Sequence, residues 1–219
     1  MNRLAIFDCD GTLVDSQANI CRAMEEAFAL AQLEPPHRND IRRIVGLSLV
    51  EAIARLLPHA DAGLHRAMAE DYKRVFFTLR GNGAMEEEPL FDGIAEALEA
   101  LDDAGWLLGV ATGKSDRGLA HILEHHGIRH RFVTLQTADR HPSKPHPSMI
   151  EAAIAEAGAA PETSAMIGDT SFDMLMARAA GAHAIGVAWG YHPPHELNEA
   201  GAHHVAEHAG ELMRHLAAR

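Results

Sequence analysis

The feature that most constrains the fold is an alternation of short apolar segments with amphipathic helical segments. Runs this short and this continuously apolar are typical of strands buried on both faces. They lie at residues 4–7, 107–111, 132–135, 165–167 and 184–187. Apolar residues at helical spacing fill 94–101, 119–123 and 149–154 between them. Alternating strands and helices predict an α/β fold whose core is a Rossmann-like parallel sheet, with right-handed crossovers and helices on both faces.

One long segment, residues 15–83, interrupts this alternation directly after the first strand and has only helical periodicity. An apolar stripe over residues 20–31 stops at two prolines, and Asn39 or Asp40 can cap a short helix. Ser48 opens the sequence SLVE, which has the form of a capping box, and a third helix is expected over 64–79. We therefore predict an α/β core domain of residues 1–14 and 84–219 with an inserted all-helical cap domain, residues 15–83.

Four polar segments come at or just after the ends of predicted strands. They are DCDGT at 8–12, TGK at 112–114, SKP at 143–145 and GDTSFD at 168–173. Ligands of open parallel sheets bind beyond the carboxyl ends of the strands. The convergence of four such segments predicts one site at that edge of the sheet.

The acidic residues of these segments predict a cation. Asp8, Asp10 and Asp169 in one crevice would repel each other by ~1 kcal/mol per pair at 4 Å in water and ~4 kcal/mol at an effective dielectric of 20. Oxygen ligands favour a hard ion, and Mg²⁺ suits a site of one or two carboxylates, waters and a phosphate oxygen. Lys144, which keeps its charge near neutral pH, can neutralise Asp8 and a phosphate from the other side.

The other polar positions suggest how a phosphate is held. Thr112 ends a strand, and the backbone N–H groups from Gly113 onward open a helix that can bind phosphate oxygens, although an ordinary helix cap is an equal reading. Asp173 lies four residues after Asp169 and can face the site from the first turn of a helix. We expect Asp173 to orient Lys144 or a metal-bound water rather than to bind the metal.

In order and spacing, the segments FDCDGTLVDS, ATGKS, SKPHPSM and MIGDTSFDMLMARAAG resemble the motifs of the haloacid dehalogenase superfamily of hydrolases. The resemblance covers essentially the whole chain, because PLFDGIAEALEALDDAGW is also similar to the family's segment before its second motif. Residues 15–83 resemble the small helical cap of the phosphoglycolate phosphatase-like branch. One departure is Gly113, where many relatives have Asn.

The resemblance implies a role for each matching residue. Asp8 would be the nucleophile that forms an aspartyl-phosphate, and Asp10 would be the general acid and then the general base. The Asp8 carboxylate, the Asp10 backbone carbonyl and Asp169 would hold Mg²⁺, and Thr112 and Lys144 would bind the phosphoryl oxygens. Dehalogenating members lack the second acid, so Asp10 argues against dehalogenation.

Substrate choice is expected to lie in the cap. Arg42, Arg43 and Ser48 flank the turn RRIVGLS, which in similar proteins faces the core site. Arg43 could bind a substrate carboxylate or a second phosphate in bidentate fashion, and Ser48 could assist it. A solvated arginine on a helix is an equally good interpretation.

The favoured function is a Mg²⁺-dependent phosphatase acting on a small phosphorylated metabolite such as 2-phosphoglycolate or a sugar phosphate. An alternative is a phosphomutase of phosphosugars, which requires a cap acid/base near residues 12–16, where no His is found. A third reading is a binding or regulatory protein that keeps the fold without turnover.

The composition limits the classes of partner and the cellular compartment that we expect. The 219 residues include 31 acidic and 19 basic residues, and the net charge of −12 disfavours nucleic acid and anionic membranes. The two cysteines, Cys9 and Cys21, cannot build a disulfide framework, which favours a reducing cytoplasm. The first apolar run is broken at Asp8, so it is neither a signal peptide nor a membrane span. We expect a cytoplasmic monomer or homodimer.

Overall fold

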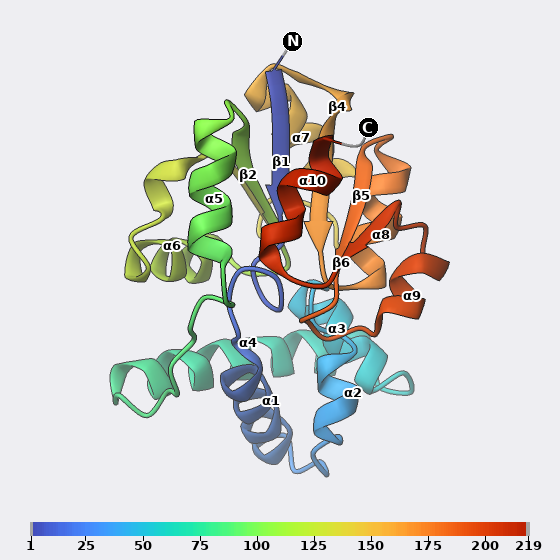
Figure 1. The fold of residues 1–219 in the computed structure, drawn as a ribbon. Helices are drawn as coiled ribbons and strands as arrows, with labels where there is room; N and C mark the ends of the chain where they lie inside the picture. The colour runs from blue at the N-terminus through green and yellow to red at the C-terminus, as the bar shows by residue number, and fades with distance from the viewer. Residues whose placement is uncertain (1, 218–219) are drawn as a thin grey trace.

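The computed structural model describes residues 2–217, and within them six parallel strands form one sheet (Figure 1). Their order across the sheet is β3-β2-β1-β4-β5-β6. The bounds are β1 (Asn2–Phe7), β2 (Leu107–Thr112), β3 (Phe132–Thr137), β4 (Ala159–Gly168), β5 (His183–Val187) and β6 (His204–Ala206). The expected α/β fold with a Rossmann-like parallel sheet is confirmed.

Helices cover both faces of the sheet, which is why the central strands are apolar on both sides. Residues of α5, α6 and α10 share one apolar cluster, and residues of α7, α8 and α9 share the other. The bounds are α5 (Ile94–Asp103), α6 (Asp116–His125), η1 (Arg129–Arg131), α7 (Ser148–Ala157), α8 (Ser171–Ala179), α9 (Pro194–Glu199), η2 (Ala209–Glu211) and α10 (Leu212–Ala217).

The direction of winding reverses between β1 and β4. The chain moves from β1 outward through β2 and β3, and then crosses back to place β4 on the other side of β1. Helices that follow adjacent strands on opposite sides of this reversal diverge and leave a crevice at the carboxyl ends. Phe7 of β1 pairs with Ile167 of β4, so the residues that follow these two strands emerge side by side.

Four helices between β1 and α5 lie beyond this crevice (Figure 1). They pack around an apolar cluster that includes Ile20, Met24, Ile53 and Met68, with Phe172 of α8 inserted from the core. The bounds are α1 (Gln17–Leu30), α2 (Arg38–Arg42), α3 (Leu49–Leu56) and α4 (Ala62–Gly81). We propose that residues 15–83, called the cap below, act as one domain.

Three local details differ from the sequence-based expectations. Helix α2 begins at Arg38 rather than after Asn39 or Asp40, because the His37 ring accepts a hydrogen bond from the Asn39 N–H at 3.1 Å and caps it. Ser48 does precede α3, but its side chain makes no capping hydrogen bond. The three-residue strand β6 was missed, because it is too short to show a period.

Within residues 2–217, no helix combines the length and apolar character that crossing a bilayer requires.

Candidate active site

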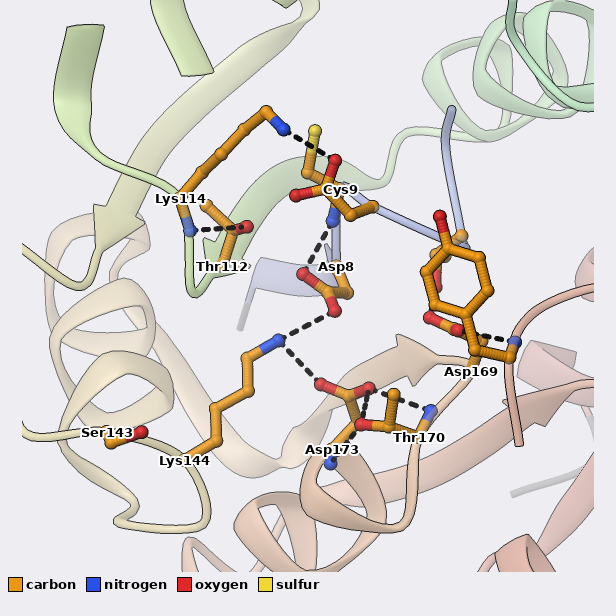
Figure 2. Close-up of polar contacts among 12 residues, drawn as sticks. Asp8, Cys9, Thr112, Lys114, Ser143, Lys144, Asp169, Thr170 and Asp173 are labelled. Carbon is orange, nitrogen blue, oxygen red and sulfur yellow. Dashed lines mark hydrogen bonds and ion pairs between the residues drawn. The ribbon is translucent and has the colours of Figure 1, made fainter. Parts of the chain in front are cut away.

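Three aspartates meet in the crevice between β1 and β4 (Figure 2). Asp8 follows β1, Asp169 follows β4, and Asp173 lies in the first turn of α8. Each offers a carboxylate oxygen within 4.8 Å of the others, and all three side chains are buried. We call these residues, together with Lys144, the acidic site.

Lys144 is the cation that contacts this group. Its Nζ lies 2.9 Å from Asp8 Oδ2 and 2.7 Å from Asp173 Oδ1, and the residue is only 1% exposed (Figure 2). Asp173 uses its other oxygen to accept hydrogen bonds from the Thr170 N–H at 3.1 Å and the Thr170 hydroxyl at 2.7 Å. Asp173 therefore fixes both Lys144 and the start of α8, and its two oxygens are engaged.

Backbone and hydroxyl donors hold the other two aspartates. The Cys9 N–H donates to Asp8 Oδ1 at 2.6 Å. Asp169 accepts from the Thr12 hydroxyl at 2.8 Å and from the Tyr191 N–H at 2.9 Å. These bonds set the orientation of each carboxylate before any ligand is bound.

The positive charge near the buried aspartates does not offset the effect of burial on their pKa values. Burial raises the pKa of Asp8 to about 7 and outweighs the lowering effect of Lys144, while Asp173 and Asp10 add smaller raising effects. Burial, and then Asp8 and Asp173, raise the pKa of Asp169 well above its ordinary value. A divalent cation between these oxygens would reverse both shifts, and an all-oxygen donor set fits Mg²⁺.

Asp10 is directed away from the three clustered aspartates. Its Oδ1 lies 2.5 Å from Lys114 Nζ and accepts a hydrogen bond from the Ser16 hydroxyl. Burial acts to lower the pKa of Lys114, but Asp10, with Cys9 and Glu88, raises it above the ordinary value. Lys114 therefore remains charged beside the expected general acid.

The charges of the acidic site do not balance. Asp8, Asp169 and Asp173 carry three negative charges when ionised, whereas Lys144 supplies one positive charge. The two remaining negative charges equal the charge of one divalent ion. The residues present therefore fit a bound Mg²⁺ in both charge and donor chemistry.

Sequence reasoning assigned no role in the site to Lys114, Thr12 or Ser16. Lys114 was treated only as part of a helix start, because its partner Asp10 lies 104 positions away in the sequence. The one available signal was a lysine two residues after the end of a buried strand in an acidic chain. Thr12 and Ser16 lie within the segment FDCDGTLVDS but carry no signal of their own.

The turn after β1 depends on Gly11. Its φ of +83° lies in the left-handed region that favours glycine, and a Cβ there would overlap the Asp169 carboxylate and the Tyr191 ring. The glycine thus lets the chain turn while Asp169 approaches its backbone. Asp8 and Asp10 leave this turn toward different partners.

Thr112 and Gly113 lie where β2 meets the cap. Thr112 is buried, and its hydroxyl accepts a hydrogen bond from the Lys114 N–H at 3.2 Å. A Cβ on Gly113 would lie 2.5 Å from the Leu47 carbonyl oxygen and 2.7 Å from that of Gly46. The departure from Asn at this position therefore has a steric reason: the cap backbone packs directly on residue 113.

Arg43 and Ser48 contact the core at different places. Arg43 pairs with Glu196 of α9 at 3.0 Å, and its carbonyl oxygen accepts from His192 Nε2 at 3.2 Å. The Ser48 N–H donates to the Ser143 hydroxyl at 2.8 Å, next to Lys144. Ser48 lines the cavity between cap and core, whereas Arg43 does not.

That cavity has a volume of about 510 Å³ and extends from Asp10 and Lys114 into the cap. Its walls come from α1, the segment between α2 and α3, α3, α4 and the start of α6. We call it the cap cavity. It joins the expected general acid to a space large enough for an organic group.

The chain is similar to known proteins over most of its length. The family model of haloacid dehalogenase-like hydrolases matches residues 5–187. The chain is 36% identical to a probable phosphatase, IndB, of Dickeya dadantii, over 97% of this chain and 93% of that protein. It is 34% identical to a phosphoglycolate phosphatase of Agrobacterium fabrum, over 87% and 82% of the two chains. A crystal structure described as a predicted phosphatase from Clostridium acetobutylicum superposes with a TM-score of 0.87 at 26% identity and covers 99% of both chains.

Proposed function

The chain belongs to the haloacid dehalogenase-like hydrolases, in the branch that resembles phosphoglycolate phosphatase, and we propose that it is a Mg²⁺-dependent phosphatase of small phosphomonoesters. The observation that carries this proposal is the acidic site, where a buried aspartate at a strand end lies against a buried lysine and two further aspartates. Phosphoryl transfer asks mainly for positioning and charge neutralisation, which this site offers.

In the proposed reaction Asp8 is the nucleophile. A carboxylate oxygen of Asp8 forms a bond to phosphorus while the bond from phosphorus to the leaving alcohol oxygen breaks, which gives an aspartyl-phosphate. The Cys9 N–H holds Asp8 Oδ1 and Lys144 lies at Oδ2, so the carboxylate is oriented before the substrate arrives. Water then attacks phosphorus, releases inorganic phosphate and regenerates Asp8.

Asp10 is proposed to move the proton in both half-reactions. It donates a proton to the departing alcohol oxygen and later accepts one from the attacking water. Ser16 and Lys114 hold its Oδ1, so its carboxyl group keeps one orientation through both steps. Lys114 thus has a positioning role that complements the role of Asp10.

The remaining site residues are proposed to hold the phosphoryl group and the metal. The Asp8 and Asp169 carboxylates and the Asp10 backbone carbonyl would bind Mg²⁺, which would neutralise the acidic site and the phosphate. Thr112, the backbone at Gly113 and Lys144 would bind the phosphoryl oxygens. Asp173 would keep Lys144 in place without binding the metal, because its oxygens contact Lys144 and Thr170.

An assay of phosphate release from 4-nitrophenyl phosphate tests this proposal. We expect release with Mg²⁺, none with excess chelator, and a loss of at least about 10³-fold in kcat for Asp8→Asn. Asp103→Asn, at the exposed end of α5, is the matched control and should keep full activity. Unchanged activity in Asp8→Asn would refute the assignment of the nucleophile.

A further inference from the structure

We infer that the alcohol released from the substrate carries an aromatic or heteroaromatic ring system and is much larger than a two-carbon acid. This inference rests on the proposed phosphatase function and specifies its substrate class. It comes from the volume, the position and the lining of the cap cavity.

The position of the cavity assigns it to the leaving group. Asp10 and Lys114 line it, whereas Asp8, Asp169 and Lys144 do not. A phosphoryl group attacked by Asp8 would therefore lie at the cavity's inner end, with the alcohol oxygen facing Asp10. Everything attached to that oxygen on the alcohol side would extend into the cavity.

The volume is far larger than a two-carbon acid requires. Glycolate has five heavy atoms and would occupy roughly 150 Å³ at ~30 Å³ per heavy atom, the share of one water in the liquid. The cavity offers about 510 Å³. At the same scale, roughly 17 heavy atoms would fill it, which is enough for one or two rings.

Apolar side chains form most of the lining, three of them aromatic, and the cations Lys73, Arg80, Lys114 and Arg117 complete it. Helix α1 contributes Ile20 and Met24, and α4 contributes Tyr72, Phe76 and Phe77. The Tyr72 and Phe76 rings lie one helical turn apart, with centroids 5.7 Å apart and planes at 29°. A ring system could pack on these apolar faces, whereas a small polyol or carboxylate would leave most of them uncovered.

Two arginines extend the flat surface. The Arg117 guanidinium lies 4.5 Å from the centroid of Phe77, and that of Arg80 lies 5.3 Å from the centroid of Phe76. Planar guanidinium groups stack on rings and donate hydrogen bonds to ring oxygens and nitrogens. Arg43, for which the sequence allowed either carboxylate binding or a solvated position, is paired with Glu196 outside the cavity.

A matched substrate panel tests the inference. Phosphate release with Mg²⁺ is measured for pyridoxal 5′-phosphate and cytidine 5′-monophosphate, and for 2-phosphoglycolate and glycerol 3-phosphate. We expect kcat/KM for the better ring-bearing ester to exceed that of either small ester by at least about tenfold. Equal or better use of the small esters would overturn the inference and leave the phosphatase proposal standing. No release from any ester, including 4-nitrophenyl phosphate, by folded protein would overturn both.

Variants of the aromatic pair provide a second test. Phe76→Leu and Tyr72→Leu keep an apolar side chain but remove the ring, and each should lower the ring-to-small ratio of kcat/KM about threefold to tenfold. Val133→Ala, at an exposed side chain of β3 outside the cavity, is the control and should leave the ratio unchanged. A ratio unaltered by both ring-removing variants would contradict the inference even if the panel favours large esters.

Discussion

The acidic site and the cap cavity lie next to each other but differ in almost every physical property. The acidic site is buried, densely charged and fixed by hydrogen bonds and ion pairs between carboxylates, lysines and backbone groups. The cap cavity has a volume of about 510 Å³, is mostly apolar and is bordered by partly exposed aromatic residues. The difference suggests a division of roles, in which the sheet edge carries out phosphoryl transfer and the cap selects the alcohol.

The most damaging single change to the acidic site should be Lys144→Met. It leaves Asp8 and Asp173 buried without their cation, so we expect a loss of about 3–5 kcal/mol in the free energy of unfolding and of at least about 10²-fold in kcat. Urea unfolding and phosphate release measure the two effects. The double variant Lys144→Met/Asp173→Asn should recover stability but not activity. If it recovers both, Lys144 has only a structural role.

Removal of Mg²⁺ should weaken the acidic site and leave the cap cavity unaffected. At 100 times the dissociation constant, bound metal stabilises the folded state by about 2.7 kcal/mol. For a chain of this size that corresponds to roughly 5–10 °C in Tm. A thermal melt with and without chelator measures the shift, which Asp169→Asn should abolish and Asp103→Asn should retain. A shift that persists in Asp169→Asn would place the metal elsewhere.

Lys114 lies at the border of the two regions, so its replacement shows how sharply their roles separate. Lys114→Met removes the side chain that holds Asp10 while leaving Asp8, Lys144 and Asp169 in place. We expect kcat to fall about 10- to 100-fold with little change in KM, because the loss affects proton transfer. Steady-state kinetics of phosphate release measure kcat and KM for the variant and the unmodified protein. A rise in KM at constant kcat would instead make Lys114 a residue that binds the alcohol.

The smallest expected effect concerns a contact that joins cap and core outside both regions. The Ser171 N–H donates to His192 Nδ1 at 3.2 Å, so Nε2 carries the proton donated to the Arg43 carbonyl, and the ring is neutral. Burial lowers the pKa of His192 below its ordinary value, although Glu196 acts to raise it. The unfolded chain therefore binds a proton first as the pH falls.

His192 therefore adds no pH dependence to the free energy of unfolding well above pH 6.5. Below that value, protonation of His192 in the unfolded chain lowers the free energy of unfolding as the pH decreases. When the pH falls from 7.5 to 5.5, we expect the free energy of unfolding of the protein to decrease by up to about 1 kcal/mol more than that of the variant His192→Gln. Urea unfolding at the two pH values measures this difference. Equal losses would show that His192 is protonated as readily in the folded state as in the unfolded one.

Much of the fold was predictable because its signals are local. The five longer strands and the helices between them follow from apolar runs and helical spacing within windows of a few residues. The positions of Asp8, Thr112 and Asp169 at strand ends are also local, and the rule that ligands bind at the carboxyl ends of parallel strands brings them to one edge.

Contacts between distant segments were not predictable from the sequence. The pairing of Lys114 with Asp10 joins residues 104 positions apart, and the pairing of Arg43 with Glu196 joins residues 153 apart. Lys114 and Arg43 could equally have faced solvent, because the identity of a single charged residue does not indicate which residue it will contact. The same holds for Gly113, whose steric reason is the cap backbone of Gly46 and Leu47.

The amino-acid sequence by itself determined the α/β class, the place of the helical insertion and the family, because periodicity and motif spacing are properties of the chain. Only the tertiary structure decided which lysine holds which aspartate, and that aromatic side chains of α4 face the space beside Asp10. Such arrangements depend on how separate elements pack, and packing brings together residues whose separation in the sequence has no period.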